Sequence, residues 1–467
     1  MIDLTPSLYT DISTPLYQQI YEYIKSEIIS GNLTSGTRLP STRVLSQNLD
    51  VSRSTVCLAF DQLLSEGYIE SVSCKGYFVS QLDGLYSIKA QPASVAMMPV
   101  ADTDKYLVDF SPNGVDLEHF PFNIWRKVTK NVLTVDSKEL FNIGDPKGEL
   151  FLRTNIASYL HQSRGVLCSP EQIILGAGNE YLLMILHHLL DSDAVFAMEN
   201  PTYAKAFKTL TGLGHTIHAI SMDNSGISVD ELGKCNANVA YVTPSHQYPL
   251  GIVMPVKRRS ELLNWACEKP GRYIIEDDYD SEFRYKGKPI PALLGSDTNG
   301  RVIYLGTFSK SIAPAIRMSY MVLPSSLLDI YNQKCRHLSC TVSRIDQAVV
   351  NSFIEDGYYE RHLNKMRGHY KMCHDLLLTQ LQPFEKHFKI DGENAGLHLL
   401  LTSRKKNDEK DLITRAKQLG VKVYPLSQYY IKPPEKAIKN TVILGYATLS
   451  QDKIVKGIQL LKEAWDI

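Results

Sequence analysis

The first 80 residues alternate apolar and polar positions in a pattern that predicts three short helices followed by a two-stranded hairpin. The first helix is expected over residues 15–30, where an apolar stripe recurs every four residues: Leu16, Ile20, Ile24 and Ile28. Ser41 and Ser52 are of a residue type that caps helix N-termini, and they predict helices over 41–48 and 52–65.

Two short helices joined by a tight turn form the helix-turn-helix pattern, whose second helix enters the major groove of DNA. The first turn of that second helix offers side chains that can reach bases and phosphates: Ser52, Arg53, Ser54 and Thr55. Residues 67–70 and 76–79 flank a turn that contains Lys75, which predicts a hairpin wing. Arg43, Arg53 and Lys75 all fall at docking positions of such a unit, so the pattern predicts DNA binding.

Charge leaves a second interpretation of this region open. Residues 1–80 carry five basic and eight acidic side chains, a net charge of −3, whereas a DNA-binding domain usually carries an excess of basic residues. A small helical interaction module would fit that balance. Several of the acids fall on the first helix or at helix ends, however, and the placement of the basic side chains favours a DNA-binding domain.

From residue 108 to residue 467 the pattern changes to short β-branched runs separated by longer helical stretches. The clearest runs lie at 172–175, 194–198, 239–242, 273–275 and 302–304. This alternation predicts an α/β fold with a mostly parallel, helix-covered sheet. Residues 81–107 lack periodicity and are interpreted as a linker. From about residue 345 a long helix followed by strands predicts a small C-terminal α+β subdomain.

One lysine in the second region stands out. Lys310 follows an apolar strand on a turn of small residues, which is how a fold presents an amine for a Schiff base. Thr307, Ser309 and Arg317 lie close to it in the sequence and offer two hydroxyls and a guanidinium to a phosphate. Pyridoxal phosphate requires both features, so this segment predicts that cofactor.

A glycine turn at residues 175–180 follows a predicted strand and opens a helix. Gly178 and Asn179 are therefore placed to offer backbone N–H groups and a helix N-terminus to the same anion. Such turns are common, so this signal is weak without Lys310. Tyr203 follows another strand and is a candidate to stack on the cofactor ring, although it is equally well explained as a core or loop tyrosine.

The segment 276–280 ends an apolar strand with a run of acids. A carboxylate at the C-terminal end of a strand can pair with the pyridinium nitrogen of the cofactor, and Asp277 is the candidate. Tyr279 is expected near the phenolate oxygen of the cofactor. Metal binding or helix capping would explain the acids alone, but the 33 residues from Asp277 to Lys310 match one strand–helix–strand unit.

Composition narrows the class of protein. The formal net charge is zero, so no global field points to nucleic acid. The eight cysteines form no Cys-X-X-Cys pair, and neither a zinc site nor a disulfide framework is expected. No apolar run approaches the roughly 18 residues of a membrane helix. No signal-peptide pattern opens the chain, and we expect a cytoplasmic protein without membrane partners.

The two regions also resemble known families. Three segments resemble the winged helix-turn-helix of GntR-family regulators, within about residues 14–80: residues 39–45, 51–56 and 66–69. In that family the arginines that match Arg43 and Arg53, and the wing glycine that matches Gly76, contact DNA. Five zones resemble a fold-type I pyridoxal-phosphate-dependent aminotransferase in order and spacing, within about residues 108–465: 175–180, 199–203, 243–251, 276–280 and 304–317.

Together these resemblances identify the chain as a member of the MocR/GabR subfamily. Membership implies double-stranded DNA with repeated half-sites as a partner. It also implies a homodimer that exchanges heads and tails, each DNA-binding head resting on the cofactor domain of the partner.

The chain departs from the aminotransferase pattern at two places. Residues 248–251 read Tyr-Pro-Leu-Gly where many aminotransferases carry Asn-Pro-Thr-Gly, so Tyr248, Gln247 or His246 would have to support the cofactor phenolate. The strand at 442–447 carries no arginine for a substrate carboxylate.

The effector site departs as well. Subfamily members that respond to γ-aminobutyrate hold its carboxylate with two arginines, and Lys205 and Gln428 stand at the matching positions. Lysine keeps the charge without the bidentate fork, and glutamine loses the charge. The resemblance therefore implies a different effector: another amine or amino acid, a D-alanine-containing dipeptide, or pyridoxal phosphate itself.

The leading hypothesis is a pyridoxal-phosphate-dependent transcriptional regulator that senses an amine through an aldimine at Lys310. Binding of the effector would shift the cofactor domain and change the affinity for paired DNA half-sites. One alternative is an active aminotransferase with an accessory DNA-binding head. A third interpretation, a vestigial pocket that serves only dimerisation, conflicts with the presence of Lys310, Asp277, Tyr279 and Arg317.

Overall fold

A computed structural model describes residues 14–81, 106–285, 290–393, 395–405, 408–433 and 440–467. The linker predicted at 81–107 lies, apart from its ends, outside these residues. The chain forms two compact units, Met1–Thr103 and Asp104–Ile467. Within the described ranges, no helix is both long and apolar enough to cross a membrane.

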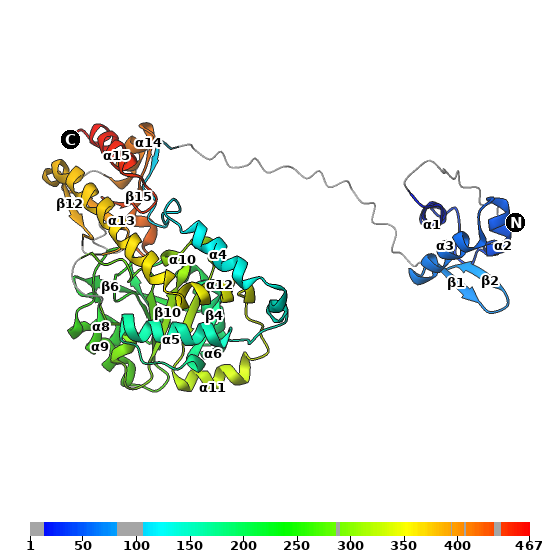
Figure 1. Ribbon diagram of the computed structural model, residues 1–467, viewed down its shortest axis with the longest axis horizontal. Coiled ribbons are helices and arrows are strands. Elements are labelled where there is room, and N and C mark those ends of the chain that lie inside the picture. Colours follow the sequence, from blue (N-terminus) through cyan, green and yellow to red (C-terminus); the bar gives the residue numbers. More distant parts are fainter. Residues whose placement is uncertain (1–13, 82–105, 286–289, 394, 406–407, 434–439) are drawn as a thin grey trace. The chain divides into compact units, whose positions relative to one another are not determined.

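The N-terminal unit contains the three helices and the hairpin that the sequence predicts (Figure 1). Its elements are α1 (Leu16–Ile29), α2 (Thr42–Asn48), α3 (Arg53–Ser65), β1 (Ile69–Val72) and β2 (Gly76–Val79). The apolar stripe of α1 packs against α3: Ile20 and Ile24 are buried with Phe60 and Leu63.

The large sheet of the second unit has eight strands in the order β4-β11-β10-β9-β8-β5-β6-β7. The central strands β10, β9, β8, β5 and β6 are parallel, and β11 runs antiparallel between β10 and β4. The bounds are β4 (Ile173–Gly176), β5 (Phe196–Asn200), β6 (Ile217–Asp223), β7 (Gly226–Ile227), β8 (Val239–Val242), β9 (Tyr273–Asp278), β10 (Val302–Thr307) and β11 (Ser319–Val322). The prediction of a mostly parallel sheet is confirmed.

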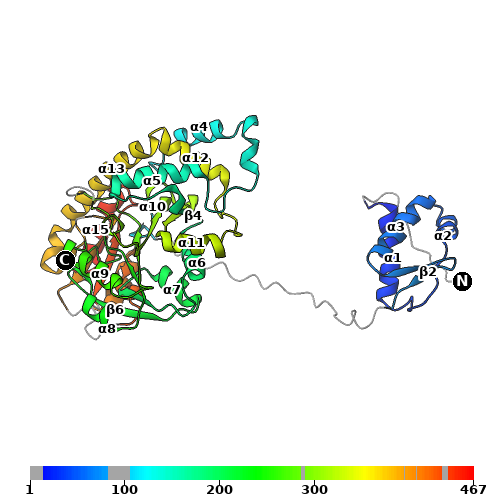
Figure 2. The same ribbon diagram turned by 90° about the horizontal axis from the view of Figure 1, so that it is seen from below.

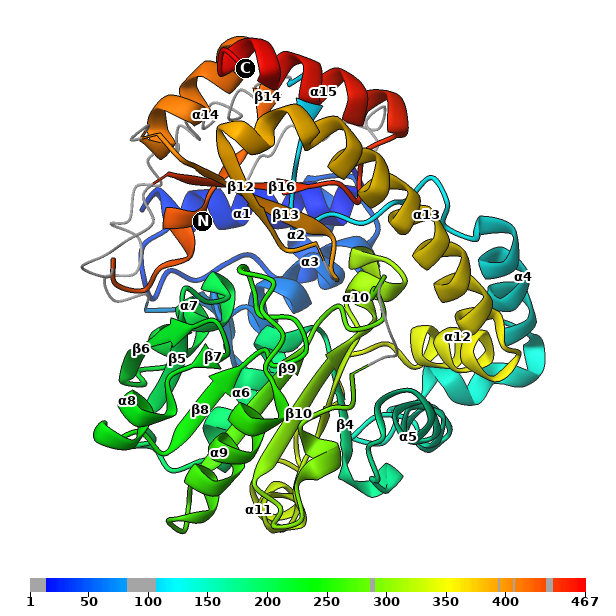
Figure 3. The ribbon, with the colours of Figure 1, turned by 90° about the vertical axis from the view of Figure 1, so that its left-hand side faces the viewer.

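Helices cover both faces of this sheet (Figure 3). Alternate residues of one strand enter different cores: Ile275 packs with α6, α7 and α11, whereas Ile274 packs with α8 and α9. Such two-sided burial explains why the strands are apolar at nearly every position. The covering helices are α5 (Leu150–Arg164), α6 (Asn179–Leu189), α7 (Ala204–Gly212), α8 (Val229–Lys234), α9 (Val256–Cys267), α11 (Ser325–Lys334) and α12 (Arg344–Glu355).

A second, four-stranded antiparallel sheet has the order β12-β13-β16-β15. It packs against the C-terminal half of α13, α14 and α15, the last ending beside the C-terminus (Figure 2). The bounds are β12 (Phe388–Asp391), β13 (His398–Ser403), β15 (Tyr424–Pro425), β16 (Thr441–Gly445), α13 (Tyr358–Leu381), α14 (Glu409–Gln418) and α15 (Gln451–Ala464).

Two connections join this smaller layer to the rest of the unit. The strand β3 (Val108–Asp109) pairs with β14 (Val421–Lys422), so the first described segment of the unit packs into the C-terminal core. The helix α13 begins in the core of the large sheet with Tyr359 and ends in the C-terminal core with Leu377. The helix α13 therefore contributes to both cores. The loop after β3 leads to α4 (Phe122–Val132).

Candidate functional site

A cavity of about 410 Å³ lies where the central parallel strands end. The C-terminal ends of parallel strands are where α/β folds place ligands, because the loops that follow diverge there. The cavity collects most of the residues that the sequence singles out for the cofactor or the effector: Gly178, Asn179, Tyr203, Lys205, Asp277, Tyr279, Thr307, Ser309, Lys310, Arg317 and Gln428. Their individual roles stay predictions.

Lys310 lies on the short helix α10 (Phe308–Ser311), directly after β10. Its Nζ donates a hydrogen bond to the carbonyl oxygen of Pro112 at 3.4 Å. Desolvation by the surrounding protein lowers the pKa of Lys310 to about 8, Asp280 opposes that change, and the charge of Lys205 adds to it. A larger share of the amine is therefore neutral and nucleophilic near pH 7.

The acidic run at the end of β9 separates into different environments because side chains alternate along a strand. Glu276 accepts hydrogen bonds from the backbone N–H groups of Leu293 and Leu294. Asp278 forms an ion pair with Arg164 at 2.8 Å. Of the run, only Asp277 and Tyr279 line the cavity. The structure thus assigns the neighbouring acids to packing, which the sequence pattern leaves open.

Asp277 is held in place by two hydrogen bonds. The side-chain amide of Asn179 donates to its Oδ1 at 3.0 Å, and the hydroxyl of Tyr241 donates to its Oδ2. Burial raises the pKa of Asp277 to about 7, although the bond from Tyr241 opposes the rise. A cationic ring nitrogen beside this carboxylate would compensate for its burial.

Polar atoms around the cavity differ in whether the protein itself gives them a hydrogen-bond partner. The hydroxyl of Ser309 is buried and has no hydrogen-bond partner among the described residues, and Oδ1 of Asn179 is in the same position. Oγ1 of Thr307 caps α10 by accepting from the backbone N–H of Ser309 at 3.1 Å. Buried polar atoms without partners are costly, so such atoms mark where a ligand group completes the network.

Gly178 forms a cradle beside these groups. Its φ of +100° suits glycine, and a Cβ there would lie 2.2 Å from Nη2 of Arg317. Arg317 is half exposed and pairs with Glu180 at 3.1 Å, an exposed pairing that an incoming phosphate can replace. The glycine turn, the guanidinium and the free hydroxyl of Ser309 together fit a phosphate group.

Aromatic side chains form one wall of the cavity. The rings of Tyr203 and Tyr248 meet edge to face with centroids 5.9 Å apart. The hydroxyl of Tyr248 lies 3.1 Å from Oδ1 of Asn113 and 3.1 Å from the hydroxyl of Tyr429, and its single proton can be donated to either. Tyr279 contacts Nδ1 of His246 through its hydroxyl at 2.9 Å.

The three side chains that the sequence proposes as substitutes for the missing asparagine differ in whether they reach the cavity. Tyr248 lines the cavity. The amide of Gln247 instead donates to the carbonyl oxygens of Pro201 and of Tyr248, and His246 pairs with Asp280 at 2.9 Å. Tyr248 is therefore the substitute with access to a ligand.

The mouth of the cavity carries exposed polar side chains. Lys205 and Lys208 lie one helical turn apart on α7, and Gln428 faces the same space from the 3₁₀ turn Leu426–Tyr429. Among the described residues that line the cavity, Arg317 is the one arginine. The mouth thus offers two point charges and no bidentate fork other than the one beside Gly178.

Sequence reasoning does not find several of the lining residues. Lys208 could have been found from its three-residue spacing after Lys205 on a predicted helix. Ser319 lies opposite Thr307 across β10 and β11, and that register is not visible in the sequence. Asn113 comes from a loop that only the fold brings to the cavity.

The residues predicted to contact DNA lie on the N-terminal unit. The side chain of Ser52 caps α3 by accepting from the backbone N–H of Thr55 at 3.1 Å, and Ser41 caps α2 in the same way. All seven candidates reach solvent, five of them exposed and Thr55 and Gly76 partly buried; the five are Arg43, Ser52, Arg53, Ser54 and Lys75. Gly76 has a φ of +111° and lies beside Arg38, a further exposed cation that the predictions omit.

Comparison with protein families assigns both regions. Residues 16–79 match the family of bacterial regulatory proteins named gntR, and residues 106–455 match aminotransferase class I and II.

Relatives match along the whole chain. The HTH-type transcriptional regulator YdeL of Bacillus subtilis is 42% identical over 100% of both chains. The probable rhizopine catabolism regulatory protein MocR of Rhizobium meliloti is 33% identical over 97% of this chain and 94% of its own length.

A solved structure matches the second unit. The kynurenine aminotransferase of Pyrococcus horikoshii, in complex with PMP, is 26% identical, with a TM-score of 0.68 over 78% of this chain and 91% of that chain. The match supports an aminotransferase-like fold around the cavity that holds Lys310.

Proposed function

This chain belongs to the aminotransferase class I and II family and carries a gntR-family regulatory region, the combination of the MocR/GabR subfamily, and on that premise we propose that it is a transcriptional regulator that senses an amine through pyridoxal phosphate. The observation that carries the proposal is one chain that joins a gntR-family region to a cavity lined by a buried lysine, a buried aspartate and an unpartnered hydroxyl. We further propose that it acts as a homodimer on DNA with repeated half-sites.

The cofactor proposal is supported by the chemistry of the cavity. When bound, pyridoxal phosphate supplies an aldehyde that reacts with amines and a ring that withdraws electrons. Lys310 would react with the aldehyde, and Asp277 would pair with the ring nitrogen; that both line one cavity supports these roles. Thr307, Ser309 and Arg317 would hold the phosphate, with the unpartnered hydroxyl of Ser309 as the clearest support.

The effector proposal follows from the mouth of the cavity. The charges of Lys205 and Lys208 favour an amine that also carries an acidic group, and Gln428 can donate to the same group. That amine would compete with Lys310 for the aldehyde that the cofactor supplies, and the ε-amine of Lys310 would then be free. The free ε-amine of Lys310 would change the contacts of α10, and pairing of Lys205 and Lys208 with the acidic group would change those of α7. The equilibrium between conformations would shift with these contacts.

The experiment is an absorbance titration of the purified full-length protein. Visible absorbance on adding pyridoxal phosphate reports loading, and its change on adding a panel of amino acids and acidic amines reports effector binding. Repeating the titration with DNA from the region upstream of the gene tests whether DNA and effector binding are coupled. Linkage requires that each ligand alters the affinity for the other by the same factor.

The outcomes separate this proposal from an aminotransferase. A regulator shows an absorbance change that saturates, a matching change in DNA affinity, and little keto acid at steady state. Continuous keto-acid production with unchanged DNA affinity would instead identify an enzyme with an accessory head. Lys310→Ala should abolish the absorbance response, while Lys371→Ala, an exposed lysine on α13, serves as the matched control.

A further inference from the structure

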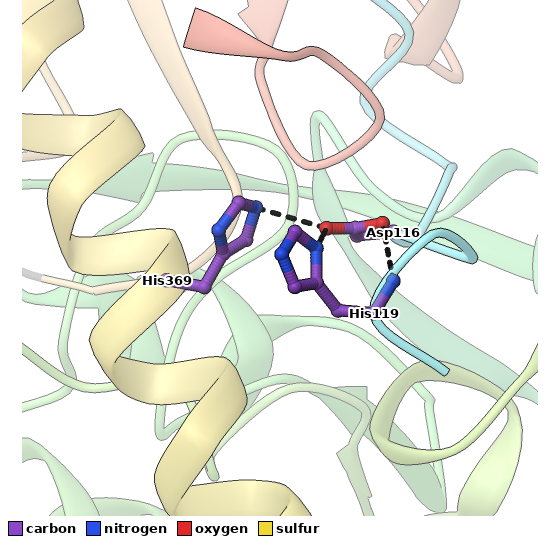
Figure 4. Close-up of side chains that lie close together, drawn as sticks. All are labelled: Asp116, His119 and His369. Carbon is purple, nitrogen blue, oxygen red and sulfur yellow. Dashed lines mark hydrogen bonds and ion pairs between the residues drawn. The ribbon is translucent and has the colours of Figure 1, made fainter. Parts of the chain in front are cut away.

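A second group of chemically active side chains lies outside the cofactor cavity. Asp116 and His119 belong to the loop between β3 and α4, and His369 lies on α13 (Figure 4). Oδ2 of Asp116 is 2.5 Å from Nδ1 of His119 and 2.9 Å from Nε2 of His369. The three ligand atoms all lie within 4.8 Å of one another.

We propose that Asp116, His119 and His369 bind one late first-row transition metal ion, of which zinc is the representative. Two imidazole nitrogens and one carboxylate oxygen form a donor set that suits zinc, while magnesium and calcium prefer oxygen alone. This site is independent of the proposed function of the cavity. The sequence does not predict this metal site, because its three ligands are brought together only by folding.

The geometry needs little change to accept the ion. Zinc at about 2.0–2.1 Å from each ligand separates tetrahedral ligand atoms by about 3.3 Å. The two distances from Asp116 would therefore open by less than about 1 Å. Figure 4 shows both rings turning a nitrogen toward the carboxylate. The side chains of Asp116 and His369 are 9% and 12% exposed and that of His119 is 38% exposed, so an ion can enter from solvent.

Other contacts hold the ligands in position. Oδ1 of Asp116 accepts from the backbone N–H of Glu118 at 2.7 Å, which leaves Oδ2 for the ion. The backbone N–H of Asp116 donates to the hydroxyl of Tyr370 at 3.0 Å. A ligand set that is already oriented loses less conformational entropy on binding an ion.

The ion would clamp the loop after β3 onto α13. That loop also supplies the carbonyl oxygen of Pro112, which accepts from Lys310, and Asn113, which contacts Tyr248 in the cavity wall. Metal at this site would therefore stabilise one wall of the cofactor cavity as well as the junction with α13. The expected result is a higher melting temperature for the metal-loaded protein.

The test uses full-length protein that has been dialysed against a chelator. Calorimetric titration with zinc chloride should show one equivalent per chain, with no comparable response to magnesium chloride. His119→Ala and His369→Gln should each lose that equivalent, together with the zinc-dependent rise in melting temperature. His119 is on a partly exposed loop, so its variant is expected to fold even if that of His369 does not.

A matched control comes from a second histidine-bearing cavity, lined by His187, His188 and His337 among others. A His187→Ala/His337→Ala variant should keep the equivalent of zinc. The proposal is overturned if wild-type protein binds no zinc, if His119→Ala still binds it, or if only the control variant loses it.

Discussion

The lowered pKa of Lys310 makes a quantitative prediction about how fast the protein takes up its cofactor. At pH 7.5 a lysine of pKa 10.5 is neutral in about one molecule per thousand, whereas at a pKa of about 8 it is neutral in roughly one of four. Because the neutral amine is the nucleophile, the cavity should raise the reactive fraction of Lys310 about 200-fold over an exposed lysine.

The perturbation is Lys205→Gln. Lys205 is a cation whose charge lowers the pKa of Lys310, so its removal should raise that pKa and slow uptake at pH 7.5. Lys208 lies one helical turn further along the same helix, and Lys208→Gln is the matched control with a smaller expected effect.

The assay mixes cofactor-free full-length protein with pyridoxal phosphate and follows the visible absorbance of the lysine–cofactor adduct as a function of pH. The rate should be half-maximal near pH 8 and level off about one pH unit higher, and the Lys205→Gln curve should move to higher pH. A rate that still rises steeply beyond pH 10, or a Lys205→Gln curve displaced to lower pH, would refute the assignment of Lys310 and its environment.

Four further changes test other parts of the molecule. Gly178→Ala places a Cβ 2.2 Å from a guanidinium nitrogen at a φ of +100°, and equilibrium dialysis should show weaker cofactor binding, while Gly212→Ala, which meets nothing within 4 Å, should bind normally. Ser52→Ala removes the cap of α3 and should cost about 1 kcal/mol in the unfolding free energy of the N-terminal unit, measured by denaturant titration. Burial raises the pKa of Asp277 to about 7, so the folded protein keeps this carboxyl protonated after the unfolded chain has lost the proton. The cofactor-free protein should therefore lose stability as pH rises from about 4 to about 7. Asp277→Asn should flatten that loss, measured by thermal melting across this range. Gln428→Arg adds a bidentate cation at the cavity mouth, and carboxylate-bearing amines should bind about tenfold more tightly in the absorbance titration.

Much of the fold follows from local signals in the sequence. The stripe that includes Ile20 and Ile24 predicts α1, and the serines at 41 and 52 predict where α2 and α3 begin, because each cap satisfies a backbone N–H at a helix end. The apolar runs predict the central strands because a sheet that helices cover on both faces buries nearly every strand position. Since parallel strands end at one edge of a sheet, the side chains that follow them could be expected to converge on one cavity.

What the sequence does not reveal depends on long-range pairing. The antiparallel strand β11 places Ser319 beside Thr307, and neither its direction nor its register leaves a local trace. The pairing of Val108 with Val421 joins segments more than 300 residues apart, and the Asp116 cluster similarly requires α13 to pass beside a distant loop. Loop closure over such distances is decided by the whole fold rather than by nearby residues.

The contrast between a fixed cofactor end and a flexible effector end of the cavity fits a sensor better than an efficient enzyme. The group that would meet the cofactor ring, Asp277, is buried and fixed by Asn179 and Tyr241. The groups that would meet an effector, Lys205 and Lys208, are exposed cations on flexible stems. A point charge attracts an acidic group without fixing its orientation. Catalysis depends on orientation, since a small displacement of the reacting atoms is costly, whereas a binding equilibrium needs only a difference in affinity between two conformations.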